Sequence, residues 1–287
     1  MTKKADIPNK SLQIPKVITQ TAKLLEAISP KLVTLFAAKL FTTPIKHSTP
    51  KREYGMEQNS IQQKLLVPKI NKTINVYQYG QSQRRVLLVH GWSGRGTQLV
   101  KFADELVRNG FSTISFDAPA HGKSGSKTTL MPEFIASILE IEKQFGPFEF
   151  VIGHSLGGMS ILNAIKVGFV VNKAVIIGSG DIIQDIINDF ISKLGLNSNI
   201  GLLMKIHFEK KHQLSMDSFS AWHAAKEINI PVLVIHDKND DEVPVKCAYH
   251  IHENLRQSEL MITENLGHRK ILGDKNVIAK TIDFIKS

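Results

Sequence analysis

The hydrophobic pattern of the chain changes near residue 61. Residues 61–67 and 73–79 alternate between apolar and polar positions, which is typical of an antiparallel strand pair with one exposed face. Six later segments are short and almost wholly apolar, as expected of strands buried on both faces of a parallel sheet. They are residues 86–90, 112–116, 148–153, 173–177, 231–236 and 259–263.

Helical periodicity separates these segments and also occurs before residue 61. In residues 97–109, Leu99, Phe102 and Leu106 recur on one face, and Gly110 follows as a C-terminal stop. Strands that alternate with helices predict an α/β fold, with a mostly parallel central sheet and helices on both faces. The predicted helices are 16–28, 31–42, 97–109, 132–145, 156–168, 182–194, 198–210, 216–227, 243–257 and 275–286.

Two stretches depart from this alternation. Residues 181–228 contain no convincing strand and have the pattern of two or three helices, so they predict a helical cap above the strand ends. Residues 1–60 predict a basic helical extension that ends in a polar link over 44–60. We therefore expect an N-terminal extension (1–60), an α/β core (61–180 and 229–287) and a cap insertion (181–228).

Positive charge is concentrated in the N-terminal region. Residues 1–52 contain ten Lys or Arg residues against Asp6 and Glu26, and so carry +8 of the formal net charge of +10. The remainder is nearly neutral, which argues against a nucleic-acid partner. Basic amphipathic helices can lie on an anionic membrane. The second predicted helix is apolar on most faces, which favours packing of residues 16–46 on the protein over peripheral membrane contact.

Composition and length indicate an ordinary globular protein. The 287 residues fit one large α/β domain with additions. The single cysteine, Cys247, excludes an intramolecular disulfide, and its place in an amphipathic helix favours simple packing. No signal-peptide-like apolar run follows the basic start, and no run of 18 consecutive apolar residues occurs. These observations predict a cytoplasmic location.

The segment with the clearest chemistry is Gly153-His154-Ser155-Leu156-Gly157, a G-x-S-x-G pattern between an apolar strand and a helix. A sharp strand-to-helix turn strains the serine backbone and leaves space only for glycine on either side. Such a turn lifts the Ser155 hydroxyl above the sheet as a nucleophile. The N–H of Leu156 opens the helix and points at a developing oxyanion.

Four further motifs each follow a predicted strand. They are residues 90–94 (HGWSG), 117–124 (DAPAHGKS), 237–244 (DKNDDEVP) and 265–268 (NLGH). Each motif alone is a weak signal, but their joint occurrence in this order is a strong one. Over residues 61–287 the chain resembles the α/β-hydrolase superfamily, in its esterase-like serine hydrolase branch. The resemblance implies the α/β-hydrolase fold.

The resemblance also implies a catalytic triad. In it, Ser155 attacks an acyl carbon, His268 moves the proton and Asp240 orients the histidine. A residue leading into the rigid Val243-Pro244 pair is held more firmly than one at the loop tip, which favours Asp240. Other carboxylates remain open as the acid: Asp181, Asp237 and Asp241.

The remaining motif residues receive supporting roles from the same resemblance. The backbone N–H groups of Trp92 and Leu156 would form the oxyanion hole. Ala120 stands where the family has glycine, so the turn in the 117–124 loop is expected to differ slightly. Asp117 and His121 suggest no third ligand, so we predict no metal. Acyl transfer by a triad also needs no cofactor.

The activity implied is hydrolysis of a carboxylic ester or thioester of a small, hydrophobic substrate through an acyl-enzyme. The alternative is a catalytically inactive binding protein or receptor on the same fold, which the intact residue set disfavours. Apolar residues of the cap predict either a pocket for an acyl or alkyl group or simple packing of helices. These residues are Phe190, Ile191, Leu194, Leu196, Leu202, Leu203, Met204, Ile206 and Phe208.

Overall fold

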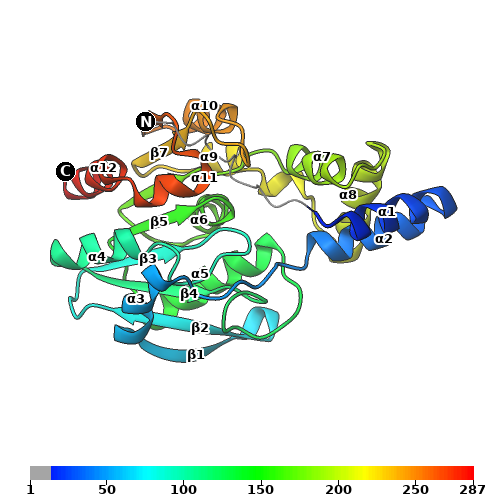
Figure 1. The fold of residues 1–287 in the computed structure, drawn as a ribbon. Coiled ribbons are helices and arrows are strands. Elements are labelled where there is room, and N and C mark those ends of the chain that lie inside the picture. Colours follow the sequence, from blue (N-terminus) through cyan, green and yellow to red (C-terminus); the bar gives the residue numbers. More distant parts are fainter. Residues whose placement is uncertain (1–13) are drawn as a thin grey trace, which may run out of the picture.

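A single eight-stranded sheet forms the centre of the molecule in a computed structural model that describes residues 14–287 (Figure 1). The strand order is β1-β2-β4-β3-β5-β6-β7-β8. The pair β1–β2 is antiparallel, as the sequence predicted, and β2–β4 is antiparallel as well. All other pairs are parallel, in agreement with the predicted, mostly parallel sheet. The strands are β1 (Ile61–Val67), β2 (Lys72–Tyr79), β3 (Arg85–Val89), β4 (Ser112–Asp117), β5 (Phe150–His154), β6 (Lys173–Ile177), β7 (Val232–Asp237) and β8 (Ser258–Thr263).

Both faces of the sheet are buried, because successive side chains of a strand point to opposite faces. In β3, Val86 and Leu88 join one hydrophobic core, while Leu87 and Val89 join the other. The first core is covered by α3 (Tyr54–Asn59), α4 (Val100–Arg108) and α12 (Lys275–Lys286). The second is covered by α5 (Met131–Phe145), α6 (Leu156–Lys166), α9 (Ala221–Ala225) and α10 (Lys246–Asn254). This arrangement confirms the predicted α/β fold class.

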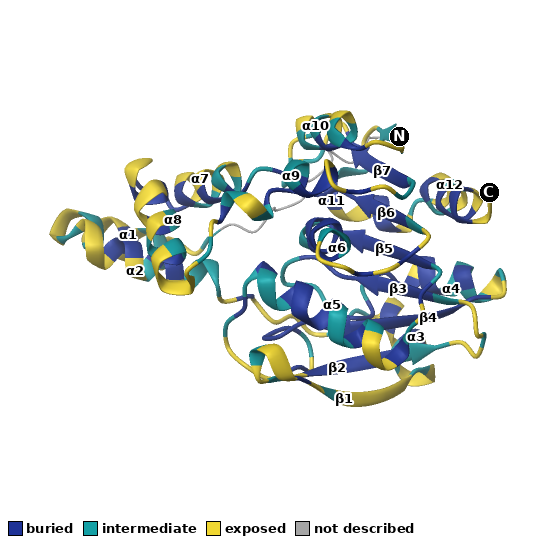
Figure 2. Cartoon of the chain, turned by 180° about the vertical axis from the view of Figure 1, so that it is seen from behind, coloured by how far each residue is buried: buried dark blue, intermediate teal, exposed yellow. Residues whose placement is uncertain are grey.

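Four helices project together from one end of the molecule (Figures 1 and 2). Two come from the N-terminal segment, α1 (Lys16–Ile28) and α2 (Pro30–Phe41), and two from the 181–228 insertion, α7 (Ile183–Lys193) and α8 (Asn199–His212). The ring of Phe41 joins the pairs, with centroids 5.2 Å from Phe190 and 6.0 Å from Phe208. The N-terminal helices therefore pack on the insertion, and we call the four helices the helical arm.

Short elements lie where the sequence predicted none or predicted a longer helix. The predicted polar link contains η1 (Lys51–Glu53) and α3, because Met56 packs into the core and buried Glu53 accepts a hydrogen bond from Thr97 Oγ1 (2.7 Å). The predicted helix 216–227 is divided into η3 (Asp217–Phe219) and α9. The other short elements are η2 (Pro68–Ile70), α11 (Gly267–Lys270) and η4 (Ile271–Gly273). Across residues 14–287, no helix is both long and apolar enough to cross a bilayer.

Candidate active site

Ser155 occupies a sharp turn between β5 and α6. Its backbone has φ +55° and ψ −122°, a strained conformation for a residue with a side chain. A Cβ at residue 153 would lie 2.8 Å from the backbone carbonyl carbon of Gly157, and one at residue 157 would lie 2.7 Å from the carbonyl oxygen of His90. The turn therefore needs glycine on both sides of the serine, as predicted from the motif. Ser155 itself is half-buried and remains accessible.

His268 and Asp240 form a close pair beyond the ends of β8 and β7. His268 Nδ1 lies 2.7 Å from Asp240 Oδ2, and the two side chains are 6% and 1% exposed. Asp240 Oδ1 accepts the backbone N–H groups of Glu242 and Val243. Burial alone would raise the pKa of Asp240, but hydrogen bonds from His236, His268 and Val243 outweigh it and hold the pKa below its ordinary value. The carboxylate is therefore ionised and fixed in orientation.

The other candidate acids are engaged elsewhere. Asp237 Oδ2 accepts hydrogen bonds from Thr263 Oγ1 (2.7 Å) and the N–H of Leu266 (3.0 Å), so this carboxylate ties the loop after β7 to the loop after β8. Asp241 is exposed to solvent. Asp181 lies 2.5 Å from Nδ1 of a different histidine, His250. Among the four carboxylates, the one paired with His268 is Asp240.

Ser155 and this pair converge at the carboxyl ends of β5 and β6. The N–H of Ser155 donates to the last carbonyl of β6 (2.9 Å). The next residue, Gly178, has φ +57°, and a Cβ there would lie 3.2 Å from His268 Nδ1 and 3.6 Å from Asp240 Oδ2. The ring of His268 lies beside that of His154, with centroids 4.5 Å apart. In the described residues 14–287, Ser155 Oγ and His268 are not joined by a hydrogen bond. In catalytic sites such a bond often forms only when substrate binds.

Two backbone donors next to Ser155 are unoccupied. In the described part of the chain, neither the N–H of Trp92 nor that of Leu156 donates to another protein group. Leu156 is the first residue of α6, where helix N–H groups have no partner within the helix. A Cβ on Gly91 would lie 2.9 Å from Cβ of Ser155, so the loop carrying Trp92 approaches the serine closely. The role of these two donors as an oxyanion hole stays a prediction.

The loops around this centre are held by buried polar side chains. His90 Nε2 accepts the N–H of Ala118 (3.0 Å), and burial lowers the pKa of His90 to about 4, so its ring is neutral. His121 Nε2 accepts the N–H of Ser93 (3.0 Å). Ala120, at the predicted departure from glycine, has φ +67°, which is strained for alanine. The buried histidines therefore organise the loops. Separately, residues 14–287 contain no cluster of three or more His, Cys, Asp or Glu suited to a metal.

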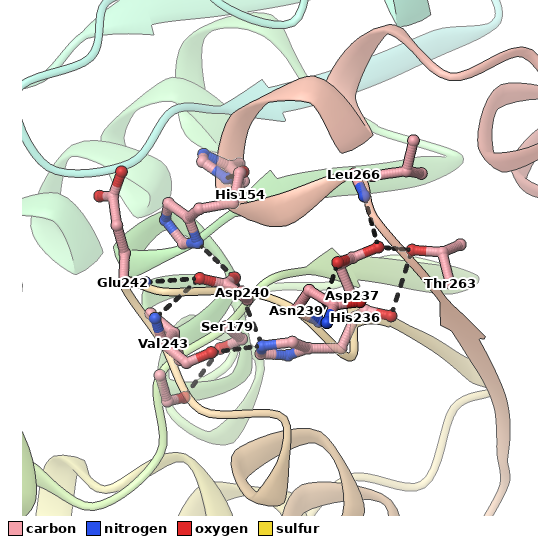
Figure 3. A network of polar contacts seen from close by, with 12 residues as sticks. His154, Ser179, His236, Asp237, Asn239, Asp240, Glu242, Val243, Thr263 and Leu266 are labelled. Carbon is pink, nitrogen blue, oxygen red and sulfur yellow. Dashed lines mark hydrogen bonds and ion pairs between the residues drawn. The ribbon is translucent and has the colours of Figure 1, made fainter. Parts of the chain in front are cut away.

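Sequence reasoning missed two histidines that support the pair (Figure 3). His154 Nε2 lies 2.9 Å from the backbone carbonyl of His268, and burial followed by repulsion from His268 keeps the pKa of His154 well below its ordinary value. His236 Nε2 lies 2.9 Å from Val243 O and 3.5 Å from Asp240 Oδ2. His154 directly precedes Ser155, and His236 directly precedes the 237–244 motif. Only the three-dimensional structure shows that their rings turn inward.

A second Asp–His pair, Asp181 and His250, lines a cavity of about 260 Å³ whose lining does not include Ser155, Asp240 or His268. Cys247 also lines this cavity, and burial raises the pKa of its thiol to about 11. The thiol is therefore protonated at neutral pH, as expected for a packing role. The cavity is lined by Asp181, Ile182, Asp185, Lys246, Cys247 and His250.

The fold is that of an α/β-hydrolase. A family model described as the alpha/beta hydrolase family matches residues 86–274, about two thirds of the sequence. The chain belongs to the alpha/beta hydrolase family. No curated protein matches the chain significantly.

Solved structures with the same fold have different activities in their descriptions. An esterase from Exiguobacterium antarcticum is 18% identical, with a TM-score of 0.63, and the match covers 79% of this chain and 100% of the esterase. A bromoperoxidase from Bacillus anthracis is 17% identical, with a TM-score of 0.62 and coverage of 79% and 100%. A membrane phospholipase A is 16% identical, with a TM-score of 0.63 and coverage of 95% and 100%. At such identities the likeness shows the fold alone.

Proposed function

We propose that this protein is a serine hydrolase that cleaves a carboxylic ester or thioester of a small, hydrophobic molecule. The observation that carries the proposal is the His268–Asp240 pair, 2.7 Å apart, at the carboxyl ends of the parallel strands, where Ser155 lies in a strained turn. The two free N–H groups of Trp92 and Leu156 complete the chemistry that acyl transfer needs. The neighbouring structures described as an esterase and a phospholipase support ester hydrolysis as the reaction class.

The mechanism assigns one step to each group. Asp240 keeps the proton of His268 on Nδ1, which leaves Nε2 free to take the Ser155 proton as the hydroxyl oxygen attacks the acyl carbon. The N–H groups of Trp92 and Leu156 stabilise the negative oxygen that forms. His268 then protonates the leaving alcohol or thiol, and the acyl group stays on Ser155. A water molecule activated by His268 releases the acid and restores the serine.

Two observations bear on the substrate: the extent of the structural matches and the burial of the cap residues. The phospholipase match extends over 95% of this chain, whereas the esterase match extends over 79%, so the phospholipase alignment reaches into the N-terminal segment. Five of the apolar cap residues are buried in a hydrophobic core, which favours packing over a pocket for these five: Ile191, Leu194, Leu196, Met204 and Phe208. We therefore base the hydrophobic substrate class on the reaction class of these neighbours, with acyl esters of short to medium length as the first choice.

A serine-directed probe tests the proposal directly. A fluorophosphonate should label the wild-type protein and fail to label Ser155→Ala. The same substitution should lower turnover of p-nitrophenyl esters by about 10⁴-fold to 10⁶-fold. Unlabelled wild-type protein with no turnover of esters or thioesters would instead indicate a binding protein on a hydrolase scaffold.

The second Asp–His pair supplies a matched control for the general base. His268→Gln should lower turnover by several orders of magnitude, because it removes the proton acceptor. His250→Gln also removes a histidine bound to an aspartate, but in a cavity that is not lined by Ser155, Asp240 or His268, and should retain most activity. The reverse result would overturn the assignment of His268.

A further inference from the structure

Large exposed apolar side chains gather on three helices of the helical arm. Among residues 14–287, α1, α2 and α8 contain 39 residues but carry eight of the fifteen large hydrophobic side chains that are exposed. Single exposed apolar residues are normal, whereas a group of them on helices that contact one another is a candidate interaction surface. The eight residues are Val17, Leu24, Ile28, Leu32, Leu35, Leu202, Leu203 and Ile206.

In α1 these residues form a stripe along one side. Val17, Leu24 and Ile28 lie within about 40° of one another around a helix of 100° per residue. They are 71%, 64% and 64% exposed, whereas Ala22, on the opposite side, is fully buried. The helix thus uses one apolar face for packing and leaves a second apolar face in solvent. Packing on the rest of the arm does not account for this second stripe.

In α8 the exposed apolar residues also lie on one side of the helix. Leu202, Leu203 and Ile206 are spaced by one, three and four positions, so they share a face, while Met204 and Phe208 are buried on the other side. Lys210 lies on the exposed face, four residues after Ile206. Apolar and cationic side chains therefore occur together on this helix.

Two lysines lie beside the exposed apolar residues of α2 and have no acidic partner. Lys31 and Lys39 share the exposed face of α2 with Leu32 and Leu35. The described part of the chain contains no salt bridge to either lysine. The one acidic residue of these two helices, Glu26, is occupied by the backbone N–H of Asn197 (2.7 Å). The exposed surface is therefore apolar and positive at once.

We propose that the exposed faces of α1, α2 and α8 dock the protein on an anionic membrane surface. An anionic bilayer offers apolar depth for the leucines and negative headgroups for the lysines. A second copy of the chain fits less well, because pairing the same faces would bring lysines together without counter-charges. The arm that carries these helices projects beyond the sheet body (Figure 1). The proposal concerns attachment alone and holds whatever the catalytic activity.

Vesicle flotation tests the proposal on the full chain. Wild-type protein and Ser155→Ala should both float with vesicles containing about one third phosphatidylglycerol in phosphatidylcholine, and not with phosphatidylcholine alone. Binding should weaken between about 0.1 M and about 0.5 M salt, because salt screens the lysines. Replacing Leu24 and Ile28 with glutamine should lower the partition coefficient about tenfold. Replacing Leu203 and Ile206 with glutamine tests α8 in the same way.

Matched substitutions elsewhere control for general loss of surface apolarity. Val167 and Val170 are also exposed, at 58% and 74%, but follow α6 on the sheet body. Changing both to glutamine should leave vesicle binding unaltered. A second pair of variants tests the role of charge by comparing Lys31→Gln on α2 with Lys101→Gln on α4. Only Lys31→Gln should reduce vesicle binding, by about fivefold.

Three outcomes would overturn the proposal. One is equal binding of the wild-type protein to anionic and neutral vesicles, or no binding to either. Another is equal loss of binding in the arm and Val167/Val170 variants. The third is a dimer in light scattering that the arm substitutions dissociate while vesicle binding is absent, which would make a second copy the partner. Circular dichroism melts check that every variant is folded.

Discussion

Replacing Asp240 with asparagine tests the proposed triad without removing side-chain volume. The neighbouring hydrogen-bond donors determine which way the new amide group is oriented. Asp240 Oδ1 accepts the N–H groups of Glu242 (2.9 Å) and Val243 (2.8 Å). Only the amide oxygen can accept two such donors, so the amide nitrogen must take the place of Oδ2, which lies 2.7 Å from His268 Nδ1. There it donates a proton, and His268 Nδ1 must become an acceptor.

The consequence is a histidine in the wrong tautomer. With Nδ1 as acceptor, the neutral imidazole carries its proton on Nε2 and cannot take one from Ser155. We expect Asp240→Asn to lower kcat about 10⁴-fold, which corresponds to about 5 kcal/mol of lost transition-state stabilisation. Because the amide fits the space of the carboxylate, the fold should remain intact.

Steady-state hydrolysis of a p-nitrophenyl ester measures this effect, and ¹⁵N NMR of the imidazole reports the tautomer. Asp241→Asn is the matched control, since it makes the same exchange on the adjacent, exposed residue of the loop. It should change kcat by less than about twofold. A folded Asp240→Asn protein with kcat within about tenfold of wild type would refute the tautomer argument.

Two further predictions concern the loops and strands around the site. His90, His121 and His154 are kept neutral mainly by burial, with the pKa lowered to about 4 for His90 and about 2 for His121. The unfolded chain protonates them near pH 6.5, so the free energy of unfolding falls as pH drops below that value, by about 4 kcal/mol for the three between pH 7.5 and pH 5.5. Urea unfolding at both pH values measures this fall in the free energy of unfolding. For His90 the fall ends near pH 4, where the folded protein also protonates the ring. A free energy of unfolding that does not change between the two pH values would contradict the burial of these histidines in the neutral form. Gly157→Ala should cost about 3 kcal/mol or more, because its Cβ would lie 2.7 Å from backbone oxygen, whereas Gly273→Ala, with nothing within 4 Å, should be nearly neutral in the same assay.

The sequence predicted the sheet well because burial on two faces leaves a strong local signal. Each of the eight predicted strands is present, with ends that differ by two residues or fewer. Short elements held by single distant contacts were missed. Glu53 is an example, because its burial depends on Arg95 and Thr97, more than forty residues away, and no periodicity marks such a contact.

The choice of acid shows how far motif reasoning extends. Residues 237–244 hold several carboxylates close together in the sequence, so spacing alone left Asp237, Asp240 and Asp241 open. What separates them is the direction of each side chain. Asp237 turns toward Thr263 in β8, and Asp240 turns toward His268. That direction depends on backbone N–H groups of the folded loop, which the sequence does not display.

The N-terminal segment illustrates the same limit and links the two proposals. Its charge predicted an extension followed by a polar link, yet the link is braced on the loops beside Ser155. The N–H of Ile45 donates to Ser93 Oγ (3.0 Å), next to Trp92, and Lys46 Nζ donates to the carbonyls of Gly122 and Ser124 (both 3.0 Å). One covalent segment therefore joins the helical arm to the loop that carries a proposed oxyanion donor. The partners of these hydrogen bonds are 48 to 78 positions apart in the chain, so no local pattern of the sequence could predict them.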